Sequence, residues 1–327
     1  MWTTKKSTFK EYKFMTGKII KQISNQYTVL AKNGEKYLVF ARGKLRYYPI
    51  GASSSFYYSI SSKNKKEKKI ITLSPKVGDN VLLDLTSDTK LIKEVYSRKN
   101  DLIRPDISNI DQVLLIFSAK KPQFSSILLD KFLVMLESYK VKIYILISKI
   151  DLLDEKELIS MKKVMKYYDS IGYNIFFDNL KNASKVLHLK KIFKGKTTVF
   201  SGQTGVGKST LLNLLKKGVN IKTQPISEAL GRGKHTTRHT ELYEIEDGLV
   251  ADTPGFSKLD LINVTEKDLN KLFIEFNNFK CKFNSCLHIN EPSCELKKDL
   301  EEGKILKSRY ENYLYLYNKI KHRKKIF

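Results

Sequence analysis

The segment SGQTGVGKST at residues 201–210 constrains the fold of this chain more than any other feature of the sequence. Its glycines, lysine and serine have the spacing of a P-loop, and the preceding run TTVF is typical of a buried β-strand. The residues from 209 to 216 have the composition of a helix. A strand, a glycine-rich turn and a helix in this order indicate an α/β protein with a parallel sheet, in which the turn binds phosphate.

The residues of this loop differ in their expected roles. Glycines let backbone N–H groups close around phosphate oxygens, and the N-terminus of the helix adds a partial positive charge. Lys208 is expected to reach the β- and γ-phosphates of a nucleotide and to assist catalysis, while Ser209 is expected to ligate Mg²⁺. The predicted nucleotide-binding residues of the loop are Gly202, Gln203, Thr204, Gly205, Val206, Gly207, Lys208, Ser209 and Thr210.

An acidic signal follows the P-loop in ADTPGF, residues 251–256. The run 248–251 is typical of a strand, so Asp252 falls at a strand end, where it can hold the Mg²⁺ shell, and Gly255 can offer its N–H to the γ-phosphate. Between the two motifs, GRGKHTTRHT at 231–240 looks like a switch loop that completes the Mg²⁺ coordination, with a plain surface loop as the alternative. The predicted Mg²⁺ ligands are Ser209, Asp252 and Thr236 or Thr237.

A third segment, SKID at residues 148–151, ends the apolar run VKIYILI. Selective binding of guanine needs a carboxylate that accepts hydrogen bonds from N1–H and the exocyclic amine, usually within an Asn-Lys-x-Asp motif at a strand end. Lys149 and Asp151 match that motif, whereas Ser148 takes the place of the asparagine. The predicted GTP-binding residues of this segment are Ser148, Lys149 and Asp151. An ordinary strand-to-helix cap is the alternative. The segment precedes the P-loop instead of following it, so the order of the motifs is unusual.

All three cysteines of the chain fall within CKFNSCLHINEPSC, residues 281–294. With one histidine they form a Cys₃His set suited to a tetrahedral structural Zn²⁺, and no position remains open for a catalytic water. Their odd number and their clustering argue against a disulfide framework. We expect one structural zinc ion to replace the hydrophobic core that this small segment cannot supply. The predicted ligands are Cys281, Cys286, His288 and Cys294.

The composition restricts the class of partner. The chain has 327 residues, with 60 Lys and Arg against 34 Asp and Glu, and a formal net charge of +26. This length predicts two or three domains and excludes a disulfide mini-scaffold. So large a charge attracts polyanions, and either nucleic acid or an anionic membrane surface would satisfy it. The longest apolar runs have the size of strands, so we expect no membrane segment and a cytoplasmic protein.

Short alternating or β-branched runs, separated by Gly, Asn and Asp turns, occupy residues 17–95. The runs 27–31, 37–41 and 80–85 predict a small all-β barrel. A basic insertion at about 47–73, which includes SSKNKKEKKI, interrupts the barrel. This insertion is either a solvated loop or a mobile basic arm that contacts RNA phosphates.

The C-terminal segment RYENYLYLYNKIKHRKKIF has helical periodicity. Tyr310, Tyr313 and Tyr317 recur at helical spacing, which favours aromatic packing over RNA stacking. The basic residues near its end suit contacts with phosphates, and a solvated charged tail is an equal alternative. These residues are Lys319, Lys321, Arg323, Lys324 and Lys325.

The order of base motif, P-loop, switch and Asp-x-x-Gly is that of a circularly permuted GTPase, and the chain resembles the RsgA family of small ribosomal subunit biogenesis GTPases. The resemblance covers nearly the whole chain and includes RGKLR at 42–46, VGD at 77–79 and RPDISNIDQ at 104–112. It implies a multidomain α/β protein with three parts. These are an N-terminal OB-fold RNA-binding domain (1–98), a circularly permuted GTPase domain (99–262) and a C-terminal zinc-binding helical domain (263–327).

The resemblance also implies a function. It predicts a GTPase that hydrolyses GTP to GDP and phosphate, binds the small ribosomal subunit and its rRNA, and acts in late maturation of that subunit with stimulation by it. We expect a monomer with no membrane partner. The family's Ser-Ala pair, which contacts guanine, has no match in FDNLKNAS at 177–184, so the resemblance assigns no residue there.

Catalysis needs a group that orients the attacking water. A Gln usually follows the glycine of Asp-x-x-Gly, but this chain has Phe256, which cannot hydrogen-bond water in that way. The resemblance places a catalytic histidine at His235, whose neutral imidazole could polarise the water, and His239 is a second choice. Two alternatives stay open: a nucleotide-gated rRNA-binding scaffold with little turnover, and a P-loop ATPase of another substrate class.

Overall fold

The computed structural model describes residues 13–41, 74–102, 105–181, 183–216, 240–252, 261 and 264–323. These residues divide into two compact units. The first comprises those up to Asn109 together with 240–242, and the second comprises those from Ile110 to 216 and from Tyr243 onward. The predicted basic insertion and the RGKLR motif lie outside the described residues. Within the described part of the chain, no helix has the length and apolar character needed to cross a membrane.

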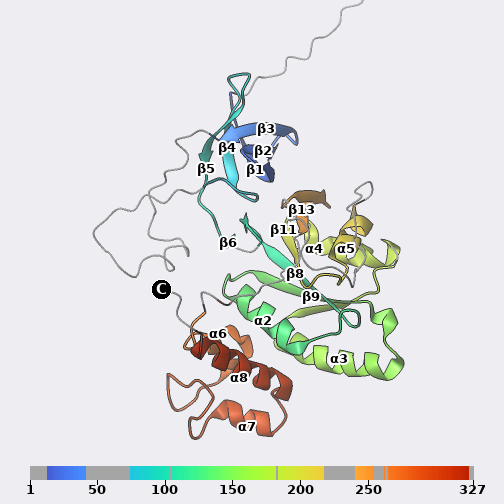
Figure 1. The fold of residues 1–327 in the computed structure, drawn as a ribbon, viewed down its shortest axis with the longest axis vertical. Coiled ribbons are helices and arrows are strands. Elements are labelled where there is room, and N and C mark those ends of the chain that lie inside the picture. Colours follow the sequence, from blue (N-terminus) through green and yellow to red (C-terminus); the bar gives the residue numbers. More distant parts are fainter. Residues whose placement is uncertain are drawn as a thin grey trace, which may run out of the picture. The chain divides into compact units, whose positions relative to one another are not determined.

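The first unit is built around a closed five-stranded barrel (Figure 1). Its strands are β1 (Phe14–Ile23), β2 (Gln26–Ala31), β3 (Lys36–Ala41), β4 (Asn80–Asp84) and β5 (Leu91–Val95), in the order β1-β2-β3-β5-β4. Every second side chain of β2 is buried, as expected for a strand with one face toward the core. The predicted all-β barrel of the N-terminal region is therefore confirmed.

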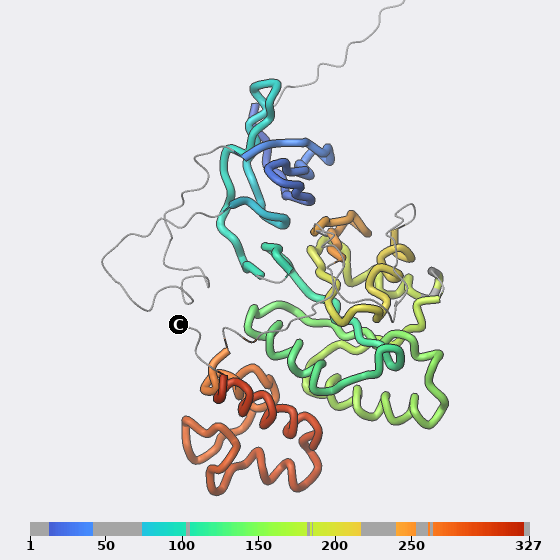
Figure 2. The backbone as a smooth tube through the Cα atoms, viewed as in Figure 1, coloured from blue at the N-terminus to red at the C-terminus, as the bar shows by residue number. Residues whose placement is uncertain are grey.

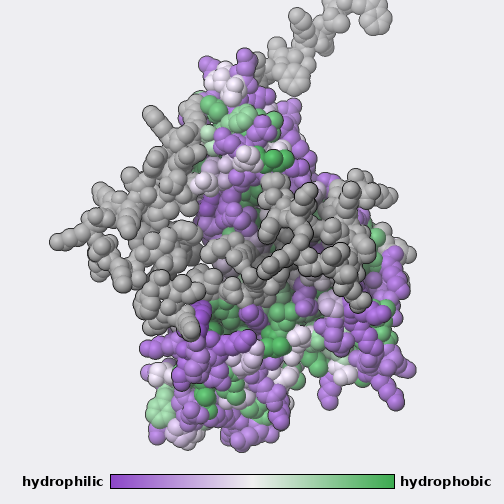
Figure 3. All heavy atoms as spheres, in the orientation of Figure 1, coloured by the Kyte–Doolittle hydropathy of each residue, from purple (hydrophilic) through white to green (hydrophobic). Residues whose placement is uncertain are grey.

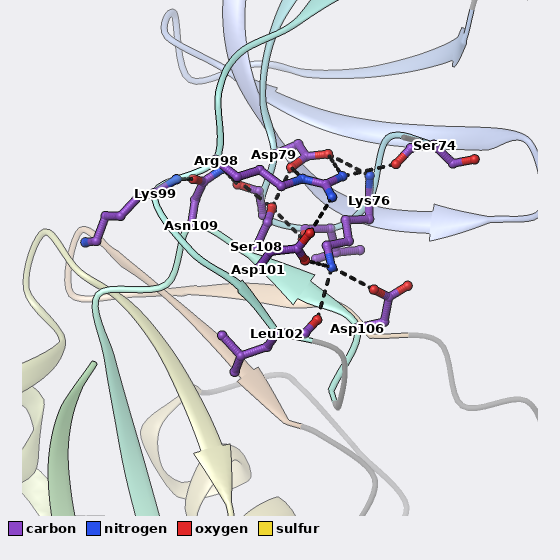
Figure 4. Close-up of polar contacts among 12 residues, drawn as sticks. Ser74, Lys76, Asp79, Arg98, Lys99, Asp101, Leu102, Asp106, Ser108 and Asn109 are labelled. Atoms are coloured by element: carbon purple, nitrogen blue, oxygen red, sulfur yellow. Dashed lines mark hydrogen bonds and ion pairs between the residues drawn. The ribbon is translucent and has the colours of Figure 1, made fainter. Parts of the chain in front are cut away.

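A charged cluster joins this barrel to a small hairpin of β6 (Asp101–Leu102) and β7 (Ile107–Ser108) (Figure 4). The Asp79 carboxylate is buried, and it accepts hydrogen bonds from Arg98 Nε at 2.7 Å and from Ser108 Oγ at 2.6 Å. Arg98 also pairs with the first residue of β6 at 2.8 Å. Because the buried carboxylate and guanidinium compensate each other, the hairpin can be held on the barrel by charged groups.

The second unit contains a six-stranded sheet in the order β10-β9-β8-β11-β13-β12. The strands are β8 (Gln112–Ser118), β9 (Lys142–Ser148), β10 (Asn174–Phe177), β11 (Thr197–Ser201), β12 (Leu242–Ile245) and β13 (Gly248–Asp252). The pairs β10–β9, β9–β8, β8–β11 and β11–β13 are parallel. All residues of β8 are buried, which explains its continuous apolar run. The predicted parallel α/β sheet is confirmed.

Helices α2 (Ser126–Glu137), α3 (Glu155–Ser170), α4 (Leu187–Phe193) and α5 (Lys208–Leu215) alternate with these strands. Helices α4 and α5 share a buried cluster with Leu114 and Ile116 of β8. The ring of Phe132 in α2 instead lies 5.6 Å from the ring of Phe117 in β8. Because successive residues of a strand point to opposite faces, α2 covers one face of the sheet, and α4 and α5 cover the other.

The C-terminal part of the second unit consists of α6 (Leu269–Leu272), the 3₁₀ helix η4 (Ile274–Asn278), α7 (Glu295–Glu301) and α8 (Lys307–Lys321) (Figure 2). Hydrophilic side chains predominate on the face of this region that Figure 3 shows. Inside it, Arg309 of α8 is fully buried and forms ion pairs of 2.5 Å with Asp130 of α2 and with Glu275 of η4. Arg309 thus joins the C-terminal helices to a helix that covers the sheet.

Candidate functional site

The candidate site lies where the parallel strands β9, β11 and β13 end. Their last residues are Ser148, Ser201 and Asp252, and parallel pairing brings these carboxyl ends to one edge of the sheet. Ligands of open α/β sheets bind at this kind of edge. The SKID segment, the P-loop and the Asp-x-x-Gly segment, which are well separated in the sequence, therefore begin close to one another.

The P-loop has a backbone that glycine adopts most easily. Gly202, Gly205 and Gly207 have φ angles of 131°, 81° and 103°. A Cβ on Gly202 would lie 2.0 Å from the carbonyl oxygen of Ile116 in β8, so the loop passes too close to that strand for any other residue. Helix α5 begins directly after the loop, and the N-terminus of a helix favours an anion.

The two side chains at the start of α5 are those predicted to bind phosphate and Mg²⁺. Lys208 is buried, and its Nζ donates to the carbonyl oxygens of Gly202 at 2.9 Å and Gln203 at 2.6 Å. Ser209 Oγ donates to Asp252 Oδ2 at 2.6 Å. Two of the predicted Mg²⁺ ligands, which come from α5 and β13, thus lie in direct contact.

The SKID segment lies against the P-loop. Ser148 is fully buried, and its Oγ lies 2.6 Å from the carbonyl oxygen of Val206 and 3.1 Å from that of Phe117. Lys149 Nζ donates to the carbonyl oxygen of Gly205 at 2.7 Å, and burial lowers the pKa of this lysine. The side chain of Lys149 makes no capping hydrogen bond to the 3₁₀ helix η2 (Ile150–Leu152), and it contacts the P-loop instead.

The loop that follows β10, in which the resemblance assigns no residue, borders the predicted base-binding carboxylate of Asp151. In this loop, Lys181 Nζ forms an ion pair with Asp151 Oδ2 at 2.6 Å. The N–H of Asp178 donates to the carbonyl oxygen of Ile147 in β9 at 3.0 Å. The Oδ1 atom of Asp178 accepts a hydrogen bond from the N–H of Leu180 at 2.7 Å. Leu180 is buried with a positive φ of 54°. The resemblance drew attention to this loop through its place after β10, but nothing in the sequence signalled the ion pair of Lys181 with Asp151.

Part of the predicted site lies outside the residues that the structure describes. Thr204 is exposed and Thr210 is half-buried in the first turn of α5, so both lie beside the residues discussed above. The residues predicted to bind phosphate, Mg²⁺ and the base lie at one edge of the sheet where the structure describes them. The predicted residues outside the described part are His235, Thr236, Thr237, His239, Gly255 and Phe256.

A second cluster, in the C-terminal part, could hold a metal ion. The ligand atoms of Cys281, Cys286, His288 and Cys294 all lie within 4.8 Å of one another. Burial lowers the pKa of His288, which keeps the imidazole neutral, and raises the pKa of the Cys286 thiol to about 12. A bound cation would supply the positive charge that buried thiolates need, so this donor set fits a metal.

Helix α8 supports the metal cluster through two tyrosines. Tyr310 Oη donates to the carbonyl oxygen of His288 at 2.7 Å, and Tyr313 Oη donates to that of Leu287 at 2.5 Å. Both tyrosines are buried, and the rings of Tyr313 and Tyr317 lie 6.4 Å apart. The predicted aromatic packing of this helix is therefore confirmed.

The basic residues near the end of α8 have different environments. Arg323 Nη1 donates to the carbonyl oxygen of Leu261 at 2.6 Å, so this arginine makes a hydrogen bond to the backbone of its own chain. Lys319 is exposed, and its Nζ lies 4.9 Å above the ring of Tyr315. Lys321 lies over the ring of Tyr317 in the same way, at 5.8 Å. The other two predicted basic residues, Lys324 and Lys325, lie outside the described part of the chain.

Comparison with known proteins identifies the family. The model of the RsgA GTPase family matches residues 95–262. The small ribosomal subunit biogenesis GTPase RsgA of Phytoplasma australiense is 46% identical over 277 residues, which cover 84% of this chain and 88% of that protein. The protein of the same name from Bacillus cereus (strain ATCC 10987) is 40% identical over 311 residues, or 94% of this chain and 98% of that protein.

Two solved structures are similar over almost the whole chain. YjeQ from Thermotoga maritima has a TM-score of 0.76 and 31% identity, and the match covers 95% of this chain and 99% of that one. YloQ, which is described as a circularly permuted GTPase, has a TM-score of 0.75 and 34% identity, and the match covers 98% of this chain and 100% of that one. The predicted fold class and resemblance are confirmed, and the chain belongs to the RsgA GTPase family.

Proposed function

We propose that the chain hydrolyses GTP to GDP and phosphate, binds the small ribosomal subunit, and acts in the late maturation of that subunit. The contact between the SKID segment and the P-loop carries the proposal. Lys149 Nζ lies 2.7 Å from the carbonyl oxygen of Gly205, so the segment with the Asp151 carboxylate borders the loop suited to phosphates. The Asp151 carboxylate can accept a hydrogen bond from guanine N1–H, whereas adenine has an acceptor at N1 and offers it no such donor. This carboxylate therefore suits GTP and not ATP.

In this proposal the P-loop amides and Lys208 hold the phosphates, as expected for the loop spacing and the start of α5. Ser209 and Asp252, which are in contact at 2.6 Å, ligate Mg²⁺ together with Thr236 or Thr237. When bound, this ion neutralises charge that develops on the phosphates. Gly255 offers its N–H to the γ-phosphate.

The catalytic part of the proposal concerns the attacking water. Because Phe256 has no group that can hydrogen-bond water, we assign this role to His235, whose neutral imidazole can accept a proton or polarise the water. Lys208 stabilises the charge of the transferred phosphoryl group. Docking on the ribosomal subunit would supply the stimulation by positioning the switch segment.

We propose that the C-terminal cluster holds one structural zinc ion. Tetrahedral zinc, with Zn–S bonds of about 2.3 Å and a Zn–N bond of about 2.0 Å, requires S···S distances of about 3.8 Å and S···N distances of about 3.5 Å. The Sγ atom of Cys294 lies 3.8 Å from that of Cys281 and 3.9 Å from that of Cys286. His288 Nδ1 lies 3.3–3.5 Å from the three sulfurs. All four positions are filled by protein, which excludes a catalytic water.

The proposed partner is the rRNA of the small subunit, bound by a monomer in the cytoplasm. The net charge of +26 favours a polyanion, and an OB-fold barrel is a common platform for single-stranded nucleic acid. We propose an RNA-binding domain at 1–98, the GTPase domain at 99–262 and the zinc-binding helical domain at 263–327. The relatives described above are named for biogenesis of the same subunit.

Phosphate release from GTP and from ATP, measured with and without purified small ribosomal subunits, tests this function. We expect slow release from GTP alone, faster release with subunits, and little from ATP. His235→Ala should remove the stimulated rate, whereas His322→Ala, which changes an exposed histidine at the end of α8, should not. Tight binding of GTP and subunits without stimulated release would instead favour the scaffold alternative, and equal release from ATP would favour the ATPase.

A further inference from the structure

We infer that Ser148 is a positioning residue for the phosphate half of the site and does not read the base. This inference rests on the proposed function, and it assigns a role to the serine that stands where related motifs have asparagine. Ser148 is fully buried at the end of β9, and its Oγ lies 2.6 Å from the carbonyl oxygen of Val206 in the P-loop.

The hydroxyl of Ser148 has one proton to give. Two carbonyl oxygens lie within reach, that of Val206 at 2.6 Å and that of Phe117 at 3.1 Å. A serine hydroxyl donates a single hydrogen bond, whereas an asparagine amide donates two. The shorter contact takes the proton, so Ser148 ties the end of β9 to the P-loop and has no donor left for a purine.

Lys149 donates a hydrogen bond to the neighbouring carbonyl group of the same loop. Its Nζ donates to Gly205 at 2.7 Å, so two successive residues of the SKID segment hold two successive carbonyl groups of the P-loop. A peptide group is planar and trans, so its N–H points opposite to its C=O. When the carbonyls of Gly205 and Val206 point toward residues 148 and 149, the N–H groups of Val206 and Gly207 must point away from them.

Lys208 orients the peptide groups in the first half of the loop in the same way. Its Nζ donates to the carbonyl oxygens of Gly202 and Gln203. Because a trans peptide N–H points opposite to its C=O, the N–H groups of Gln203 and Thr204 point away from the Lys208 ammonium. Amides that are oriented before the ligand arrives cost no reorganisation when it binds. Ser148 therefore contributes to the affinity for the phosphates of any nucleotide, and discrimination between bases is left to other groups, with Asp151 first among them.

Dissociation constants for GTP, GDP and ATP, measured by calorimetry on the full chain, test this inference. Ser148→Ala should weaken all three by the same factor, about tenfold, because it removes a buried hydrogen bond and orphans the Val206 carbonyl. The ratio of GTP to ATP affinity should stay that of the wild type. Ser148→Thr, which keeps the hydroxyl, should restore most of the affinity.

A matched control and a second variant keep the test decisive. Ser138→Ala removes a hydroxyl that donates over the same distance, 2.6 Å, to Met135 in α2, and it should leave all three constants unchanged. If Ser148→Ala does not fold, Ser148→Cys keeps the size of the side chain and weakens the donor. A fall in the GTP-to-ATP ratio, or an unchanged affinity for GTP, overturns the inference. A wild-type protein without preference for GTP contradicts the proposed function instead, whatever the variants do.

Discussion

The nucleotide site and the metal cluster both gather polar groups from separate segments, but they are held together in different ways. At the nucleotide site, parallel pairing of β9, β11 and β13 already brings Ser148, Ser201 and Asp252 to one edge. Around the metal cluster, the described residues from 264 to 323 include no strand. Backbone pairing therefore builds the first site, whereas the second depends on its ligands and on contacts from α8.

Removal of the metal should break the C-terminal region and spare the nucleotide site. A structural zinc site contributes free energy of about 10–16 kcal/mol in small domains, so we expect the turns that carry the four ligands to lose their order. Hydrogen exchange of residues 281–294, before and after chelation, measures this loss. GTP affinity should change by less than about twofold, since the sheet does not use the metal.

Acid should have the same effect as chelation, because protons compete with the metal for thiolate and imidazole ligands. Added zinc at neutral pH should restore the protected amides. The test requires protein that elemental measurement shows to be free of metal. If hydrogen exchange of residues 281–294 is unchanged in that protein, the metal does not hold this region together and the contrast with the nucleotide site fails.

Arg309→Met should cost about 3–5 kcal/mol of unfolding free energy, because it leaves the carboxylates of Asp130 and Glu275 buried without their cation. Urea unfolding measures the loss. The triple variant with Asp130→Asn and Glu275→Gln should recover most of it, since the uncompensated charges are then gone. A loss below about 1 kcal/mol in the single variant would mean that this junction does not hold α8.

Gly202→Ala tests the backbone of the nucleotide site. Its new Cβ would lie 2.0 Å from the carbonyl oxygen of Ile116 at a φ of 131°, so the loop must shift, and we expect a loss of about a hundredfold in GTP affinity, or about 2.7 kcal/mol. Titration with a fluorescent GTP analogue measures it. Gly195→Ala is the matched control, since Gly195 also has a positive φ, 64°, but no atom within 4 Å of the added Cβ.

Lys181→Met should have the smallest effect. The Lys181 ammonium and the proposed guanine both bind the Asp151 carboxylate, so removal of the exposed lysine should raise GTP affinity by less than about threefold at low salt. The gain should vanish at high salt, because ions screen exposed pairs. Lys190→Met removes an ion pair of the same length, 2.6 Å, with Glu246 in the turn between β12 and β13, and should leave GTP affinity unchanged. A weaker affinity would show that Lys181 contacts the nucleotide.

Local patterns made much of the fold predictable. Apolar runs predicted β9 and β11, and glycine spacing placed the P-loop between β11 and α5. The clustering of every cysteine in one short segment predicted the metal cluster. Each of these signals lies within a few residues of the sequence, where strand, turn and ligand spacing impose their own periodicities.

Contacts between distant segments could not be predicted in this way. Arg309 reads as one more basic residue of a polar helix, yet it is fully buried because Asp130, which lies 179 positions earlier, faces it. Ser148 meets Val206 across 58 positions, and the ion pair of Lys181 with Asp151 depends on the turn after β10. Only the folded sheet brings such groups together, so neither propensity nor periodicity reports them.

The position of β8 at the centre of the sheet has a consequence for the order of folding. On one side β8 pairs with β9, which follows after a single helix, with Gln112 opposite Lys142. On its other side β8 pairs with β11, where Gln112 Nε2 donates a hydrogen bond to Thr198 Oγ1, a residue 86 positions later in the sequence. Closing the longer loop costs more chain entropy, so we expect the half with β8, α2 and β9 to assemble first and the phosphate loop to be added later.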